Sequence, residues 1–428
     1  MEKLYLVFLL AFSSMAAAQD IYFPPLTGDT WETVDPASLN FCQSEIDSLY
    51  AFLDEEQTNA FLLLKDGRIV LEQYFDTYGV DSLGPWFSAG KSLMATLVGI
   101  AQEENLLDIN APTSTYLGSN WTSMPANQED AITVWHQLTM TSGLEDSDFV
   151  CWDPVCLTYL ADPGTRWSYH NAPYSLLRNV LESATGQTLN QYTFSKINLK
   201  TGMSGFWIPA GFNNYYLSNA RDMARFGIMI QNGGFWNTTP VLNDPVYLDA
   251  MLNTSQSINL SYGYLWWLNG QNSFIPPGLS FPLPGPIAPE APADVVTAAG
   301  SQGQYVSFSP SSGLLMIRQG DSNDNDLAAI TLINDIWKRI GGLDCTVTSA
   351  EAPTLPEVSI FPNPASDQVW VEGFDSESFT LSLFSPSGRW ISSVENQDFL
   401  DVSGLAAGLY LLQIETDAGR LTRKLILD

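Results

Sequence analysis

The chain has 428 residues, of which 45% are hydrophobic and 12% aromatic, and its formal net charge at pH 7 is -30. This length predicts one large domain accompanied by a smaller one, with enough apolar residues for a substantial core. The strong negative charge argues against nucleic acid and anionic membrane surfaces as partners, because the long-range field repels them.

The N-terminal stretch MEKLYLVFLLAFSSMAAAQD has the pattern of an export signal. Lys3 precedes an apolar run of about ten residues, and Ala16, Ala17 and Ala18 form a small-residue cleavage site. An apolar run this short cannot span a bilayer. We therefore expect residues 1–18 to be a signal peptide and the mature chain to have no transmembrane segment.

The chain continues with a helix, a hairpin, a long helical region and a second group of strands. Residues 44–57 have apolar residues at helical spacing, and residues 61–75 read as two strands around the turn Asp66-Gly67. Helical patterns dominate from residue 91 to about residue 231. Strand-like runs and a closing amphipathic helix follow at 262–268, 303–309, 314–320 and 326–340. This order predicts an α/β (α+β) fold, with a mostly antiparallel sheet flanked by the terminal helices and a helical second lobe.

The C-terminal part of the chain changes character. Residues 275–295 are proline-rich but precede further strands, so we expect a surface loop there. Residues 346–356 have the composition of a linker, which places the boundaries of the main domain at 19–345. Residues 357–428 consist of short alternating runs with Gly, Pro and Asp between them, and they predict a small β-sandwich.

The chain has four cysteines, Cys42, Cys151, Cys156 and Cys345. An even number in an exported chain favours disulfides over metal ligands. Cys151 and Cys156 bracket a short turn and could pair locally. If the first and last helices of the main domain pack antiparallel, a Cys42–Cys345 disulfide would join the ends of that domain. The two histidines lie in no cluster with zinc spacing, so we expect no metal and no other cofactor.

The stretch WFSAGKSLMATLVGI, residues 86–100, places Ser88 three residues before Lys91. On a helix such residues share a face, so the hydroxyl and the amine lie within reach of each other. A serine needs a base to become a nucleophile, and a lysine serves as that base when desolvation lowers its pKa. The apolar surroundings predict such a setting. Without further context, this spacing more often marks a helix cap and a solvated lysine.

Further motifs follow in an order typical of a known family. The hairpin at 61–75 precedes the serine and lysine, and DPGTRWSYHNAPYSLLRNVLESATGQTLNQY, SNARDMARFGIMIQNGG, YGYLWWL and AAGSQGQYVSFSP come after them. From about residue 45 to residue 340 the chain resembles the serine β-lactamase-related family, which includes class C β-lactamases, D-amino-acid peptidases, related esterases and 6-aminohexanoate-oligomer hydrolases. The resemblance implies the β-lactamase/transpeptidase-like fold, in agreement with the order of the elements.

The resemblance also implies roles for individual residues. Ser88 resembles the acylated nucleophile and Lys91 its activating partner. Tyr169 looks like the second proton-transfer group, and Asn171 like the asparagine that hydrogen-bonds the substrate or Lys91. From spacing alone, Tyr169 would be an aromatic residue in a turn. Asn171 would be the N-cap of the following helix, a position that we also expect it to occupy.

The third motif departs from the family pattern. Lactamases and D-peptidases usually have a lysine or histidine before a threonine and a glycine, whereas this chain has AAGSQGQ at 298–304. The carboxylate of a β-lactam or of a terminal D-alanine would lack a cationic partner there. This favours ester or amide substrates without that carboxylate. Arg318 on the next strand is either a substitute cation or an exposed strand residue.

Small residues in the same motif suit substrate binding at Gly300, Ser301 and Gln302. The backbone N–H groups of Ser88 and of a residue near Ser301 would form an oxyanion hole.

The two histidines and a tryptophan pair are the remaining candidates. We expect His136 to have a hydrogen-bonding role in packing. His170 replaces a serine common in the family motif, so it either lines the site and influences substrate choice or faces solvent. Trp266 and Trp267 are expected in the strand core, with one ring at the cleft.

Beyond residue 357 the chain resembles the C-terminal sorting domain of the type IX secretion system of Bacteroidota. The segments FPNPASDQVWV, LFSPSGRWI and LAAGLYLLQIETDAGRLTRKLIL carry this resemblance. It implies export across the outer membrane, followed by removal of the module or attachment at the cell surface. The alternative is an adhesive or carbohydrate-binding sandwich.

Together, these patterns predict a secreted or cell-surface serine hydrolase that forms an acyl-enzyme on Ser88. Its substrate would be a small-molecule or oligomeric ester or amide, and the type IX machinery would be its partner. Two alternatives stay open. One is a penicillin-binding D-peptidase or β-lactamase, and the other is a non-catalytic surface or binding protein on the same scaffold.

Overall fold

The computed structural model describes residues 21–148, 152–211, 213–322, 328–345, 358–373, 378–385, 390–416 and 419–427. The chain divides into a larger compact unit of residues 1–280 and 284–343 and a smaller one of residues 281–283 and 344–428. The expected signal peptide and linker lie outside the described residues. Within the described residues, no helix is long and apolar enough to span a membrane.

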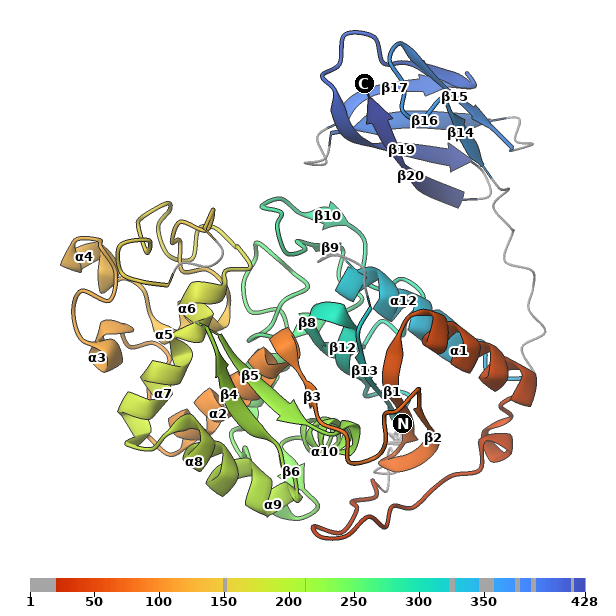
Figure 1. Cartoon of the computed structure of the whole chain (residues 1–428). Helices are drawn as coiled ribbons and strands as arrows, with labels where there is room; N and C mark the ends of the chain where they lie inside the picture. Colours follow the sequence, from red (N-terminus) through yellow and green to blue (C-terminus); the bar gives the residue numbers. More distant parts are fainter. Residues whose placement is uncertain are drawn as a thin grey trace, which may run out of the picture. The chain divides into compact units, whose positions relative to one another are not determined.

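A six-stranded antiparallel sheet forms the centre of the larger unit (Figure 1). Its strand order is β2-β1-β13-β12-β11-β8. The strands are β1 (Thr58–Lys65), β2 (Arg68–Tyr74), β8 (Trp267–Leu268), β11 (Val296–Gly300), β12 (Gln304–Ser309) and β13 (Leu314–Gly320). The predicted hairpin is β1–β2, and the positive φ values of Asp66 (49°) and Gly67 (81°) close its two-residue turn. The antiparallel sheet and its flanking helices confirm the predicted fold class.

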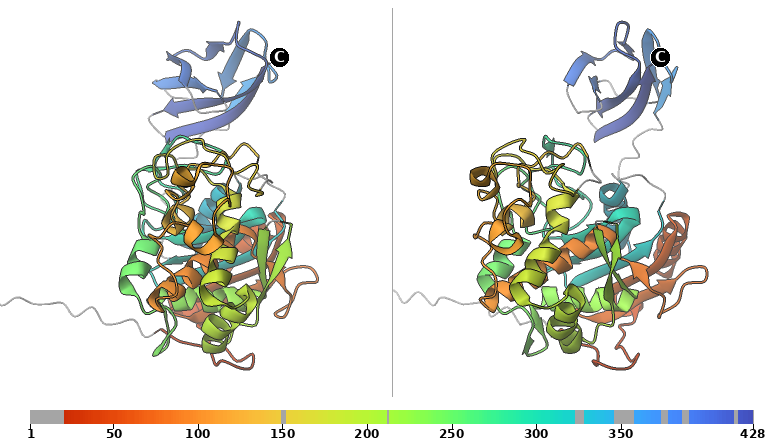
Figure 2. Two further views of the ribbon diagram at one scale, coloured as in Figure 1. Left: turned by 90° about the vertical axis from the view of Figure 1, so that its left-hand side faces the viewer. Right: turned by 60° about the vertical axis from the view of Figure 1, so that its left-hand side comes forward.

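Helices cover both faces of this sheet (Figures 1 and 2). Alternate residues of β1 face opposite layers: Phe61 packs in one apolar cluster with α1 (Gln43–Glu55) and α12 (Ala328–Gly341), and Leu62 packs in the other. This second cluster includes α2 (Gly90–Glu103) and α10 (Ala220–Gln231). Because both faces of β1 are buried, its sequence is continuously apolar and does not alternate.

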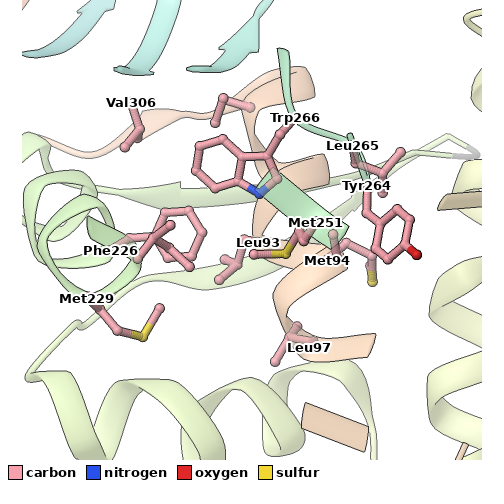
Figure 3. Close-up of a cluster of buried hydrophobic side chains, with 14 of the residues drawn as sticks. Leu93, Met94, Leu97, Phe226, Met229, Met251, Tyr264, Leu265, Trp266 and Val306 are labelled. Atoms are coloured by element: carbon pink, nitrogen blue, oxygen red, sulfur yellow. The ribbon is translucent and has the colours of Figure 1, made fainter. Parts of the chain in front are cut away.

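Buried apolar side chains pack between α2, α10 and the central sheet (Figure 3). Leu93, Met94 and Leu97 of α2 belong to the same buried cluster as Phe226 of α10 and Trp266. The Trp266 ring stacks on Phe226, with ring centroids 5.9 Å apart and an interplanar angle of 17°. The core therefore fixes the helix that carries Lys91 against the strands that line the site.

The second lobe is mostly helical. Its helices are α3 (Ser114–Leu117), α4 (Ala126–Glu129), α5 (Val134–Leu138), α6 (Asn171–Ser175), α7 (Leu177–Thr185), α8 (Leu189–Thr193), η3 (Phe194–Asn198), α9 (Leu199–Thr201) and α11 (Pro245–Leu252). The remaining short elements of the unit are η1 (Pro36–Leu39), β3 (Gly84–Pro85), η2 (Phe87–Ala89), β4 (Phe206–Ala210), β5 (Asn213–Ser218), β6 (Phe235–Trp236), β7 (Thr239–Pro240), β9 (Ser273–Phe274), β10 (Leu283–Pro284) and η4 (Ser301–Gly303).

Two sequence expectations are wrong in detail. The region predicted as helical contains the antiparallel pair β4–β5, in which buried and more exposed residues alternate along β5. The predicted strand 262–268 is regular only at β8, because Leu265 has a φ of 60° that breaks the extended backbone before Trp267.

The smaller unit contains two antiparallel sheets around one apolar core. One sheet has the order β14-β15-β18 and the other β17-β16-β19-β20. Their strands are β14 (Ser359–Phe361), β15 (Gln368–Glu372), β16 (Phe379–Phe384), β17 (Trp390–Glu395), β18 (Phe399–Asp401), β19 (Gly408–Thr416) and β20 (Gly419–Leu427). Val369 of the first sheet and Leu383 and Leu412 of the second are fully buried in this core. The arrangement is the β-sandwich expected from the alternating sequence.

Cys42, Cys156 and Cys345 are disulfide-bonded. The Cys42 N–H donates to the Leu343 carbonyl at 2.8 Å, so the start of α1 and the end of α12 are close together. This contact supports the predicted Cys42–Cys345 pairing, which stays a prediction. Cys151 lies outside the described residues, and so does its predicted pairing with Cys156.

Candidate active site

Ser88 lies in the short 3-10 turn η2, directly before α2. The Trp86 N–H donates to the Tyr216 carbonyl and its indole N–H to Ser218 Oγ, so β5 anchors the entry to the turn. Phe87 has a φ of 45°, a strained value for a residue with a side chain and one that is enriched at functional sites. The sequence therefore places the serine on a fixed, sharply bent piece of backbone.

Lys91 lies one turn further on, and its side chain is buried. Its Nζ donates a hydrogen bond to Ser88 Oγ over 2.9 Å. The ring centroids of Tyr174 and Tyr169 lie 4.3 Å and 5.1 Å from the same nitrogen. Burial lowers the pKa of Lys91 from 10.5 to about 7, because the low-dielectric surroundings disfavour the ammonium ion. At neutral pH a large fraction of this amine is free to accept a proton.

Tyr169 approaches the serine as well. Its hydroxyl is hydrogen-bonded to the Ser88 side chain. Burial raises the pKa of Tyr169 to about 12, and the hydrogen bond to Ser88 acts in the opposite direction. At neutral pH this group is therefore a phenol. Its ring stacks on Trp267, with centroids 5.9 Å apart and planes inclined by 19°, which fixes the direction of the hydroxyl.

A cavity of about 570 Å³ opens in front of these groups. The residues predicted to be catalytic or to bind the substrate line it, with the exceptions of His170 and Arg318. Its lining consists of Phe87, Ser88, Lys91, Tyr169, Asn171, Tyr174, Asn213, Asn214, Tyr215, Trp267, Pro277, Gly278, Ala299, Gly300, Ser301 and Gln302. Among these described side chains, Lys91 alone is ionisable to a cation and none is a carboxylate. The cavity therefore presents aromatic rings, neutral amides and backbone to a substrate.

The third motif forms the part of the cavity wall that adjoins the turn of Ser88. Gly300 ends β11 and lies directly against η2: a Cβ there would be 2.3 Å from the Trp86 carbonyl oxygen and 3.0 Å from the Ala89 nitrogen. Ser301 and Gln302 follow in the turn η4, where Gln302 has a left-handed φ of 63°. Close packing of a glycine brings the two walls together.

Arg318 is neither an exposed strand residue nor part of the cavity lining. It is 0% exposed, because β13 is covered on both faces. Its guanidinium donates to backbone carbonyls of the chain, including those of Gln302 and Gly303 in η4. The expectation that it is an exposed strand residue is wrong.

His170 lies between two cavity-lining residues but does not line the cavity itself. Its backbone is extended (φ -110°, ψ 117°), so its side chain points away from the side that Tyr169 faces. The imidazole is 2% exposed, which rules out the solvent-facing alternative. Burial lowers its pKa to about 4, so the ring is neutral.

Asn171 is the first residue of α6, and the N-cap position belongs to His170, so the N-cap prediction is wrong by one residue. The Asn171 Oδ1 is buried and has no hydrogen-bond partner among the described residues. His136 has the packing role expected of it: Thr133 N–H donates to His136 Nδ1 at 3.1 Å in a capping box at the start of α5.

The sequence did not predict several of the residues that line the cavity. Tyr174 lies three residues after Asn171 on the same helix face, so the spacing could have indicated it. Asn213, Asn214 and Tyr215 lie on β5, a strand in a region that we expected to be helical. No local signal relates them to Ser88, because only the packing of β5 beside η2 brings them to the cavity.

Comparison with known proteins extends these findings. Residues 53–335 match the family model "Beta-lactamase", and residues 359–428 match the model "Secretion system C-terminal sorting domain". A 6-aminohexanoate-dimer hydrolase of Paenarthrobacter ureafaciens is 26% identical over 221 residues. That match covers 42% of this chain and 54% of the relative, so the chain spans about half the length of this curated protein.

Solved structures share the fold. A putative 6-aminohexanoate-dimer hydrolase from Bacillus anthracis superposes with a TM-score of 0.55 at 18% identity, over 76% of this chain and 89% of the other. A penicillin-binding protein homologue from Caulobacter crescentus gives 0.57 at 14% identity, over 74% and 100%. Identities this low establish the fold alone.

Proposed function

Since this chain belongs to the Beta-lactamase family, whose members are serine hydrolases, we propose that it hydrolyses an ester or amide through an acyl-enzyme on Ser88. One observation carries the proposal: Ser88 Oγ lies 2.9 Å from the Nζ of a buried lysine and is also hydrogen-bonded to a buried tyrosine. A serine hydroxyl becomes a nucleophile when a neighbouring base takes its proton. Lys91, with a pKa of about 7, suits that role.

In the proposed acylation, the neutral amine of Lys91 takes the Ser88 proton while Oγ attacks the substrate carbonyl carbon. The oxyanion is held by backbone N–H groups of Ser88 and of the η4 turn. As the bond to the leaving group breaks, the Tyr169 phenol gives that group a proton. The proton on Lys91 then restores the phenol. Water attacks the acyl-enzyme in the second half of the reaction, using the same two groups, and Ser88 regains its proton.

The lining of the cavity supports an uncharged substrate. Asn171, Asn213, Asn214 and Gln302 offer neutral hydrogen-bonding groups, while Phe87, Tyr215 and Trp267 offer aromatic surface. We therefore assign the chain to esters or amides that carry no carboxylate next to the scissile bond. The named relatives include hydrolases of the 6-aminohexanoate dimer.

The alternative of a penicillin-binding D-peptidase or β-lactamase lacks its expected cation. Ala298 stands where such enzymes usually have one, and Arg318 points behind the cavity wall. The other alternative, a non-catalytic binding protein, leaves unexplained why a lysine is buried 2.9 Å from a serine at an energetic cost.

The smaller unit determines where the hydrolase acts. The sorting domain at 359–428 indicates export by the type IX system to the cell surface or the outside. We infer that residues 1–18 first direct the chain out of the cytoplasm as a signal peptide. The substrate is then a small molecule or oligomer available outside the cell.

Labelling of the full mature chain tests the proposal. We expect a fluorophosphonate probe to add one label to the wild type and none to Ser88→Ala, as read by intact mass. Failure to label the wild type would contradict a nucleophilic Ser88. A penicillin probe run in parallel separates the rivals, because stoichiometric labelling by penicillin would favour the lactam alternative.

A further inference from the structure

Arg318 is an unusual residue for its position. It is 0% exposed, and its four hydrogen bonds go to Thr58 Oγ1 and to the carbonyls of Glu56, Gln302 and Gly303. Among the described residues, no carboxylate forms an ion pair with it. Glu56 and Asp321 attract its charge from beyond ion-pair distance. A buried charge without a direct ion pair is expensive, which suggests a role beyond packing.

Two of these bonds hold the turn that forms the cavity wall. The Nη1 of Arg318 donates to the Gln302 carbonyl at 2.9 Å and to the Gly303 carbonyl at 2.7 Å. The Nε2 of Gln304 donates to the preceding carbonyl, that of Ser301, at 3.3 Å. Three consecutive carbonyls of η4 are thus held by side chains from behind the wall, while Ser301 and Gln302 face the cavity in front.

The backbone conformation of η4 is suited to binding an anion. A helical residue followed by a left-handed one turns successive N–H groups to the same side, opposite the carbonyls, and forms a concave nest. Ser301 begins the 3-10 turn, and Gln302 follows with φ 63° and ψ 17°. The carbonyls are held on the far side, and Ser301 and Gln302 line the cavity that also holds Ser88. We infer that the N–H groups of this nest are directed into that cavity.

The turn would not keep this shape by itself. A left-handed conformation costs a residue with a side chain about 1 kcal/mol or more, and Gln302 adopts it next to Gly303, whose φ is 76°. The guanidinium group of Arg318 has room because the two residues packed against it, Gly303 and Gly320, have no side chain. A Cβ would lie 2.2 Å from the Arg318 Nη1 at Gly303 and 2.5 Å from its Nη2 at Gly320.

We propose that Arg318 is a positioning residue for acyl transfer, which holds η4 as an oxyanion-binding nest and polarises the peptide group between Gln302 and Gly303. The proposal rests on the function proposed above. In the water-free interior a unit charge acts more strongly than in solvent. The Gln302 carbonyl belongs to the same peptide group as the Gly303 N–H. Accepting a hydrogen bond from the guanidinium therefore makes that N–H a better donor to an oxyanion.

Binding of phenylboronic acid tests this without knowledge of the natural substrate, because boron adds to a nucleophilic serine and forms a tetrahedral anion. We expect the affinity of Arg318→Met to fall by about 10- to 100-fold, approaching the loss of an oxyanion-hole donor. Arg318→Lys keeps the charge but loses the planar guanidinium group, so its affinity should lie between those of the wild type and Arg318→Met. With an active ester, kcat should fall by the same factor while KM stays nearly constant.

A matched control is available in Arg225. It is also buried and also donates to backbone carbonyls, those of Thr201 at 2.9 Å and Pro25 at 2.8 Å, but it does not line or brace the cavity. Arg225→Met should lower the melting temperature while changing boronate affinity less than about twofold. Equal losses of affinity in Arg225→Met and Arg318→Met would overturn the positioning role.

Two further measurements keep the outcomes distinct. If Arg318→Met does not fold, Thr58→Val removes the acceptor of Nε (2.9 Å) with little change in shape and should weaken boronate binding about threefold. No effect in Thr58→Val or Arg318→Lys would then count against the proposal. Ser88→Ala should form no boronate adduct. If the wild type also formed none, the proposed function would be overturned, and this inference with it.

Discussion

Burial of a single amine gives the candidate site its chemistry. Lys91 occupies the first turn of α2 with aromatic rings around Nζ, and its pKa falls to about 7 for that reason alone. Tyr169, buried beside it, keeps its proton because its pKa rises to about 12. In the proposed acyl transfer, Lys91 would thus serve as the base and Tyr169 as the acid at the same pH.

The pH dependence of hydrolysis follows from these values. Only the neutral form of Lys91 accepts the Ser88 proton, so kcat/KM on a neutral ester should rise with pH through about 7 and level off above it. Tyr169 should cause no alkaline loss below about pH 12. The rate would be measured from pH 5 to 10 against a Ser88→Ala background. A flat profile across pH 7 would exclude Lys91 as the base.

The same buried lysine should lower stability. Its pKa is 10.5 unfolded and about 7 folded, so between these values the unfolded chain binds a proton that the folded chain does not. Stability therefore rises with pH over this window, and the cost of burial, about 5 kcal/mol at most, is fully present below pH 7. Lys91→Met should be more stable than the wild type at pH 6 by about 2–5 kcal/mol, with the gain shrinking towards pH 10.

Urea unfolding of the full chain at pH 6, 8 and 10 measures this difference. Ser88→Ala serves as the control, because it changes the site without removing an ionisable group. A gain that is the same at all three pH values would mean that packing, and not the charge, explains the effect of Lys91→Met.

At the scale of elements, the site depends on how closely β11 approaches η2. Gly300→Ala would place a Cβ 2.3 Å from the Trp86 carbonyl oxygen, so one of the two elements has to move. A shift of about 1 Å between reacting groups costs on the order of 100-fold in rate. We expect Gly300→Ala to lose about that much kcat/KM. Gly79→Ala is the control, since nothing lies within 4 Å of its Cβ position. Unchanged activity in Gly300→Ala would show that this approach is not needed.

At the scale of the whole molecule, the chain has two units with separate cores, and we expect them to have separate functions. The larger unit contains every residue of the cavity, and the smaller one has its own apolar core of two sheets. Deleting residues 357–428 should therefore keep the hydrolase inside the producing cells with its specific activity unchanged. Fractionation of cells and medium measures this. Normal secretion of the truncated chain would contradict the sorting role.

The sequence predicts contacts between residues that are close along the chain better than contacts between distant segments. The contact between Ser88 and Lys91 could be predicted because residues three apart on a helix lie close together. The β1–β2 hairpin could be predicted because Asp66-Gly67 specifies its turn. The strand β5 could not be predicted, since it is only six residues long and begins with Asn213 and Asn214, which are poor strand formers. Its contribution to the cavity depends on packing against segments more than a hundred residues away.

The amino-acid sequence by itself determined the type of reaction to expect, the absence of a cation in AAGSQGQ and the division into a hydrolase and a sorting module. Only the tertiary structure decided the state of the groups. It buries Lys91 between two tyrosines, turns His170 away from the cavity and places Arg318 behind the wall, where it holds Gln302 and Gly303. The reason is physical: spacing along a chain fixes which residues are neighbours, whereas the dielectric surroundings that set a pKa come from every segment packed around the group.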